Sequence, residues 1–154
     1  MTPLSTYLVR ETAISAAINC AITVGFFFAV FHGQAHPAVW GAKGLVVDCL
    51  PQGFMVGLMS TVPAMLLTRK RLAAGQVAPL EPMGRPPRRI LTRSLVVAPV
   101  SMIALTVVAA AAAKATGSAS LPFGPALALK LAASAIISII VTPGAICAAL
   151  APKG

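Results

Sequence analysis

"TAISAAINCAITVGFFFAVFH", residues 12–32, contains no lysine, arginine or acidic residue. A helix needs about 20 mostly apolar residues to cross the ~30 Å hydrocarbon core of a bilayer, and this stretch meets that length. Residues 45–68, 94–113 and 126–150 form three further stretches of similar character. None of them alternates polar with apolar residues, as a membrane β-strand would. The sequence therefore predicts an all-α fold, an integral membrane four-helix bundle.

The composition of the whole chain is that of a membrane protein. Hydrophobic residues make up 58% of it and charged residues only 10%, whereas soluble domains carry roughly 25% charged residues. The net charge is +9, but the basic residues gather mainly in one segment. We interpret this charge as a topology signal and expect no nucleic-acid partner.

The segment at 69–93 is strongly basic and contains a single acidic residue, Glu81. Its basic residues are Arg69, Lys70, Arg71, Arg85, Arg88, Arg89 and Arg93. Since short loops rich in Lys and Arg stay in the cytoplasm, we expect this segment and both termini on the cytoplasmic side of a bacterial inner membrane. The basic side chains are expected to contact anionic lipid headgroups; docking of an acidic partner protein is the alternative.

The first span has an alternative interpretation. A cleaved signal peptide is an alternative for residues 12–32, but this apolar run exceeds the ~7–15 residues of a typical signal core, and one basic residue precedes it.

"APLEPMGRPPRR", residues 78–89, contains four prolines. It cannot form a regular helix, and extended backbone is expected over part of it.

The chain divides into two hairpins of similar design within a single membrane domain, at about residues 8–71 and 93–152. In each, an arginine precedes the first span, a glycine follows it, an aromatic-glycine pair marks the turn, and the second span has a charged residue early and a proline late. The matching residues are Arg10 and Arg93, Gly33 and Gly117, Trp40 and Phe123, Asp48 and Lys130, and Pro63 and Pro143. This order indicates a parallel internal repeat, although shared membrane composition could also produce it.

A resemblance follows from the same residues. An arginine, an apolar span, an aromatic-glycine corner, and a second span with "VPAML" (62–66) and "RKR" (69–71) resemble small uncharacterised bacterial inner-membrane proteins built from one or two copies of a two-helix unit. The resemblance covers most of the chain and implies the architecture alone.

Small residues recur at every fourth position of the first span. They are Ala13, Ala17, Ala21, Gly25, Ala29 and Gly33. Such a ridge lets helix backbones approach closely in lipid, so we expect it to form the main helix-packing seam, inside the bundle in preference to a homodimer. Gly53 and Gly57 form a second small pair in the next span. The aromatic residues at 26–31 are expected to anchor the helix at the membrane interface or to face lipid.

Asp48, Gln52 and Lys130 are polar residues inside apolar spans, where such groups are energetically costly and call for a structural or functional explanation. If the repeat is real, Asp48 and Lys130 occupy matching depths and form an ion pair. Alternatively, Asp48, Gln52 and the backbone carbonyl near position 47 that Pro51 frees make a proton or cation site. In a third reading, Lys130 extends to the surface on its own. The amide of Asn19, in the first span, is expected to bond a neighbouring helix.

Enzymatic and metal-binding motifs are not evident in the sequence. His32 and His36 are four residues apart without an acidic or cysteine ligand nearby, so no metal or other cofactor is expected. The odd number of cysteines, all in apolar runs, favours free thiols. These features predict a non-enzymatic multi-pass membrane protein, an accessory or assembly subunit of a membrane complex. The alternative is a small dimeric transporter or channel that uses Asp48, Gln52 and Lys130.

Overall fold

The computed structural model describes residues 3–79 and 90–151, and four long helices account for most of them. These are α1 (Leu4–Phe31), α2 (Leu45–Ala73), α3 (Ile90–Thr116) and α4 (Phe123–Leu150). Each is long and apolar enough to cross a membrane. The predicted all-α four-helix bundle and the multi-pass character are thereby confirmed.

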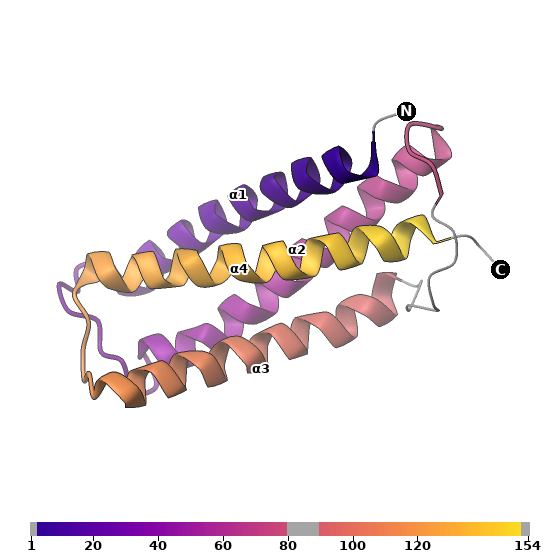
Figure 1. Ribbon diagram of the computed structural model, residues 1–154. Helices are drawn as coiled ribbons and strands as arrows, with labels where there is room; N and C mark the ends of the chain where they lie inside the picture. The colour runs from indigo at the N-terminus through magenta and orange to yellow at the C-terminus, as the bar shows by residue number, and fades with distance from the viewer. Residues whose placement is uncertain (1–2, 80–89, 152–154) are drawn as a thin grey trace.

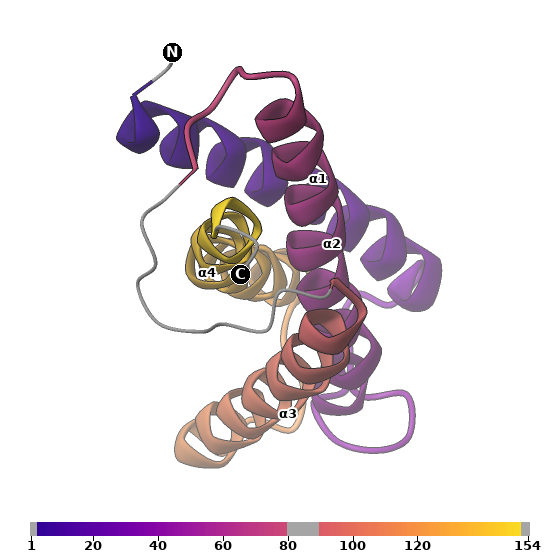
Figure 2. The ribbon, with the colours of Figure 1, turned by 90° about the vertical axis from the view of Figure 1, so that its right-hand side faces the viewer.

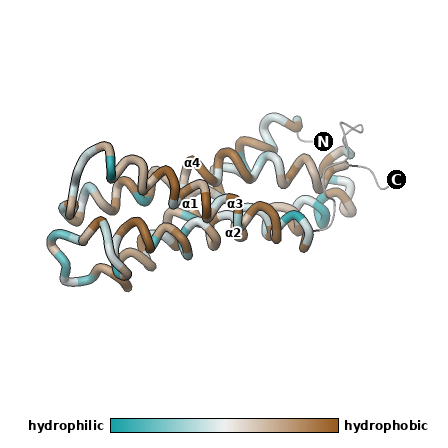
Figure 3. Tube along the Cα trace, turned by 90° about the horizontal axis from the view of Figure 1, so that it is seen from below, coloured by the Kyte–Doolittle hydropathy of each residue, from teal (hydrophilic) through white to brown (hydrophobic). Residues whose placement is uncertain are grey.

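The helices extend beyond the apolar stretches that predict them. α1 begins at Leu4 rather than near residue 12, and α3 begins at Ile90 rather than residue 94. Polar residues at these ends shorten an apolar run without interrupting helical backbone, because straight-chain residues such as Arg10 and Glu11 are good helix formers. Hydrophobic residues predominate along the helices (Figure 3).

The start of α1 and the end of α4 lie at one end of the bundle, and the turns between α1 and α2 and between α3 and α4 lie at the other (Figure 1). We call these the terminal end and the turn end. One apolar cluster forms at each end: Met65 and Ile146 belong to the terminal-end cluster, Phe27 and Val46 to the turn-end cluster. Between the two clusters, the buried side chains where α1, α2 and α4 meet are largely polar.

The two hairpins interlock rather than pack as separate units. α2 and α4 pack against each other in the centre, α1 packs mainly on α4, and α3 packs mainly on α2, whereas the two helices of each hairpin share few contacts (Figure 2). A twofold axis between α2 and α4 would relate the helices in this way, as the predicted parallel repeat requires.

The two turns also pair with each other, in an antiparallel arrangement. The amide of Val39 donates to the carbonyl of Ala119 at 2.9 Å, and that of Leu121 donates to Pro37 at 3.1 Å. Gly33 and Gly117 lie just after α1 and α3 and have φ of 81° and 63°. Both therefore adopt the left-handed conformation that favours glycine at a helix C-terminus, which is a second likeness between the hairpins.

The predicted helix-packing residues divide into two groups. A Cβ at Gly53 would lie 2.8 Å from the Cα of Met102, and one at Gly57 would lie 3.0 Å from the Cα of Ala98. These two glycines therefore allow the backbones of α2 and α3 to approach closely.

The ridge on α1 was wrongly placed inside the bundle. Ala13, Ala17, Ala21, Gly25 and Ala29 are all exposed on the outside of the chain, and Gly33 lies beyond the helix. The physical reason is that the opposite face of α1 carries hydroxyl, amide and carboxyl groups. In lipid, these groups need partners more than the alanines need burial.

The aromatic prediction is half wrong as well. Phe26 and Phe28 are exposed, but Phe27 and Phe31 are buried in the turn-end cluster. The ring of Phe123, at the start of α4, lies 4.9 Å from that of Phe27 and 5.3 Å from that of Phe28. These contacts fasten the turn end of α1 to α4.

Candidate functional site

A line of polar side chains runs through the bundle between α1, α2 and α4, and we call it the polar seam. α1 contributes Tyr7, Glu11, Ser15, Asn19 and Thr23; α2 contributes Asp48, Gln52, Ser60 and Thr68; α4 contributes Lys130, Ser134, Ser138 and Thr142. On each helix the spacing is four residues or a multiple of four. Such residues share one face of a helix, so the three polar faces can meet.

An ion pair between Asp48 and Lys130 lies toward the turn end of the seam. Lys130 Nζ donates to Asp48 Oδ2 at 2.9 Å and to Cys49 Sγ at 3.3 Å. The lysine side chain is 5% exposed and the aspartate side chain 20% exposed. Opposite charges in contact leave this depth of the bundle close to neutral. The structure thus places together the two residues that the repeat pairs.

Gln52 reaches across to α4 rather than back to its own helix. Its Nε2 donates to the carbonyl of Lys130 at 3.1 Å and to Ser134 Oγ at 2.9 Å. Ser134 also lies 2.6 Å from the hydroxyl of Thr23 on α1. Gln52 thus ties all three helices of the seam together through Ser134.

Asn19 occupies the centre of the seam and is 1% exposed. Its Nδ2 donates to Ser60 Oγ on α2 at 2.9 Å and to Ser138 Oγ on α4 at 2.8 Å. Ser60 donates in turn to Ser138 at 3.3 Å. The amide of Asn19 therefore bonds two neighbouring helices, one more than the sequence suggested.

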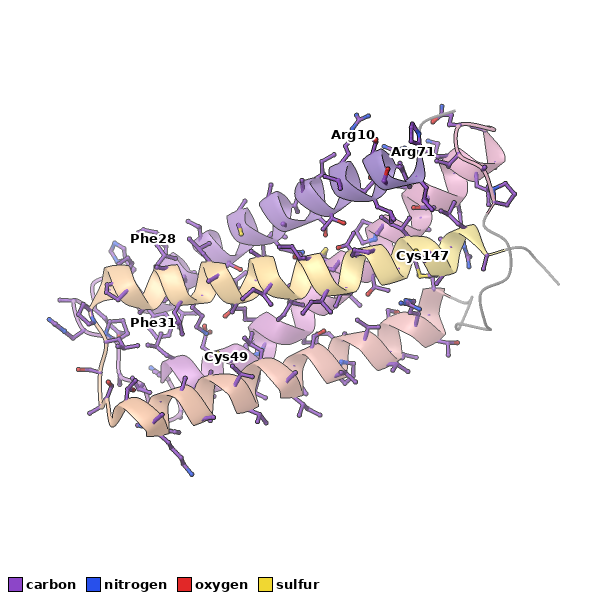
Figure 4. All side chains as sticks on the ribbon, viewed as in Figure 1. Arg10, Phe28, Phe31, Cys49, Arg71 and Cys147 are labelled. Carbon is purple, nitrogen blue, oxygen red and sulfur yellow. The ribbon has the colours of Figure 1, made fainter. Side chains whose placement is uncertain are left out.

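Near the terminal end, the seam contains a second ion pair. Arg71 Nη1 donates to Glu11 Oε1, and the guanidinium lies 5.4 Å from the ring centroid of Tyr7. The hydroxyl of Tyr7 lies 2.9 Å from that of Thr68. Figure 4 shows Arg71 beside the first turns of α1, whereas Arg10 points away from the bundle. The buried carboxylate of Glu11 therefore holds the Arg71 side chain, and its contact with lipid headgroups stays a prediction.

The remaining basic residues are placed as follows. Arg69 and Lys70 are exposed at the terminal end of α2. Arg93 lies in the first turn of α3 instead of in a loop. It is partly buried, and its Nη2 is 2.9 Å from the point where a Cβ on Gly144 would stand. The predictions for Arg85, Arg88 and Arg89, and for extended backbone in this segment, fall outside the described residues.

Two acceptor atoms in the seam have no hydrogen-bond partner among the described residues, namely Asn19 Oδ1 and Gln52 Oε1. A small cavity of about 40 Å³ lies beside Gln52, Asp48, Lys130 and Thr23. Water needs about 10–15 Å³ of such space and several polar partners, so this cavity can hold one to three water molecules next to the ion pair.

Sequence reasoning found the charged and amide residues of this site but not its hydroxyl groups. Seven serines and threonines that complete the seam were overlooked, because each is unremarkable in a membrane helix; they are Ser15, Thr23, Ser60, Thr68, Ser134, Ser138 and Thr142. Their spacing by multiples of four, in register with Asn19, Asp48 and Lys130, is the signal that would have revealed them.

Metal-ligating residues do not gather anywhere in residues 3–79 and 90–151: no group of three or more His, Cys, Asp and Glu side chains lies together there. His32 and His36 are exposed. No protein family, curated protein or solved structure matches this chain.

Proposed function

We propose that this chain is a non-enzymatic accessory or assembly subunit of a complex in a bacterial inner membrane, with both termini in the cytoplasm. The observation that carries the proposal is the contact between Asp48 and Lys130, 2.9 Å from oxygen to nitrogen. A carboxylate that couples ion movement must be free to bind and release its ion, whereas this one already has a cation beside it. The polar seam accordingly has a structural role, which is to hold α1, α2 and α4 together.

The exposed face of α1 supports an association with another membrane helix. Ala13, Ala17, Ala21, Gly25 and Ala29 leave a smooth strip along the outside of the bundle. Small residues at such a strip allow close contact between helix backbones. The partner is a different membrane protein or a second copy of this chain. Exposed Arg69 and Lys70 add contacts to anionic headgroups at the terminal end.

Substitutions on that strip test the association. Ala17→Leu combined with Ala21→Leu should prevent close approach, so that the partner or second copy no longer co-purifies from mild detergent. Ala111→Leu, on an exposed position of α3, is the matched control and should leave the complex intact. Equal retention in all three preparations would contradict an interface on α1.

A small transporter or channel remains the second candidate, and one observation favours it. The cavity of about 40 Å³ beside Asp48 and the unpartnered oxygens of Asn19 and Gln52 are features that a water-filled path could use. Reconstituted vesicles carrying a pH or cation gradient distinguish the two functions. The accessory role predicts no flux above protein-free vesicles; a flux that Asp48→Asn abolishes would establish transport instead.

A further inference from the structure

A deep apolar crevice lies between α3 and α4, with the start of α2 as its floor. Its volume is about 530 Å³, within the roughly 300–1,000 Å³ of small-molecule sites. The crevice exists because α3 packs on α2 and makes few contacts with α4. Ala104 to Thr116 of α3 and Ala126 to Ile140 of α4 form its two walls.

The opposite hairpin explains why the crevice is open. In α1, bulky rings at positions 26–28, seven to five residues before Gly33, pack at the turn end. The residues seven to five before Gly117 are Ala110, Ala111 and Ala112. Of these three alanines, Ala112 lines the crevice, and its methyl group leaves space that a ring at this position would fill. The small cavity lined by Phe26 and Phe27 is accordingly about 40 Å³, against about 530 Å³ on the α3 side.

The crevice is long and narrow. At 1.5 Å per residue, its α4 wall is about 21 Å long and its α3 wall about 18 Å, slightly more than one leaflet of a ~30 Å hydrocarbon core. A volume of 530 Å³ over 21 Å gives a mean cross-section of about 25 Å². A single chain of methylenes is thin enough to lie along this space.

The lining of the crevice specifies an uncharged occupant. Among the described residues that line it, Lys130 alone is charged, and its ammonium group is already bound by Asp48 and Cys49. The other walls are almost wholly aliphatic. Two hydroxyl residues, Thr116 and Ser118, lie where the crevice ends, at the turn end of the bundle.

We infer that the crevice between α3 and α4 binds one acyl chain of a bilayer phospholipid, with the ester and headgroup region at the turn end beside Thr116 and Ser118. The chain completes the packing that α3 lacks and covers the floor at Cys49. Binding in this crevice differs from contact with bulk lipid because two helices and a floor lie against the chain on three sides. The phospholipid should therefore remain bound through purification.

Native mass spectrometry of the protein released from mild detergent tests this inference. The natural sequence should retain one phospholipid per chain. Ala112→Phe, which projects a ring into the crevice, should reduce that adduct to a minor fraction. Ala111→Phe is the matched control, since Ala111 neighbours it on α3 but does not line the crevice, and it should retain the lipid.

Ala133→Leu, on the α4 wall, repeats the test independently of α3 and should also displace the lipid. Circular dichroism of each variant checks that the helices remain folded. Equal lipid retention in the blocking and control variants would overturn the inference. So would a retained molecule other than a phospholipid, or a dimer of the natural chain that Ala112→Phe dissociates, because a second copy would then cover the crevice.

Discussion

α1 and α3 hold corresponding places in the two hairpins, yet opposite chemistry attaches them to the centre of the bundle. α1 meets α4 and α2 through hydrogen bonds, with Asn19 at their middle. α3 meets α2 through close backbone contact at Gly53 and Gly57, and its buried residues are small or apolar apart from Ser94 and Ser101. One outer helix is bonded to the centre, and the other is closely fitted to it.

The difference shows what decides helix orientation in lipid. The small ridge and the polar stripe of α1 both repeat every four residues, but Ala17 and Asn19 are two positions apart and so about 200° around the helix. Apolar surface gains little by leaving hydrocarbon, whereas a polar group without a partner is costly. The polar stripe therefore faces inward and the small ridge outward.

The largest expected effect is on the closely fitted side. Gly53→Leu would place a side chain against the backbone of Met102 and Ser101, at 2.8 Å for its first carbon. Backbone cannot move aside, so the cost should reach or exceed the roughly 1–3 kcal/mol of ordinary overpacking. Gly25→Leu is the control, because a Cβ added at Gly25 would meet no neighbouring atom within 4 Å. In an SDS titration, the free energy of unfolding should be lower for Gly53→Leu than for Gly25→Leu. Equal values would contradict close backbone packing as the basis of the contact between α2 and α3.

A smaller effect is expected on the bonded side. Asn19→Ala removes two hydrogen bonds, to Ser60 and Ser138. Hydrogen bonds between membrane helices average about 0.6 kcal/mol, so the free energy of unfolding should fall by roughly 1 kcal/mol. Ala21→Ser, on the exposed face of α1, controls for a polarity change outside the seam. An unchanged stability for Asn19→Ala would show that the seam does not hold α1.

The smallest effect concerns the terminal end. Tyr7→Phe removes one hydroxyl and its bond to Thr68 while it keeps the ring under Arg71. The expected loss is about 0.6 kcal/mol, measured in the same titration. A loss of stability larger than that of Asn19→Ala would show that the hydrogen bonds at the terminal end, and not those in the middle of the bundle, contribute most to holding α1.

The four helices and the contact between Asp48 and Lys130 could be predicted because each rests on a local or repeated feature: apolar length for the helices, matching depth for the pair. The face of α1 that points inward could not be predicted, because its small ridge and its polar stripe have the same period. Which of the two faces inward depends on hydrogen-bond partners on α2 and α4. The destination of Arg71 was missed for the same reason. Its partner, Glu11, is 60 positions away, and the interlocked hairpins bring them together.

The most direct measurement is a double-mutant cycle on the central ion pair, read as free energy of unfolding in detergent at neutral pH. Lys130→Ala leaves Asp48 without its cation and should be more damaging than the double variant, Asp48→Asn with Lys130→Ala. The account predicts a coupling energy of at least about 1 kcal/mol between the two sites, within the 0.5–3 kcal/mol range of residues in contact. Additive effects would contradict it, because Asp48 would then be free for another role.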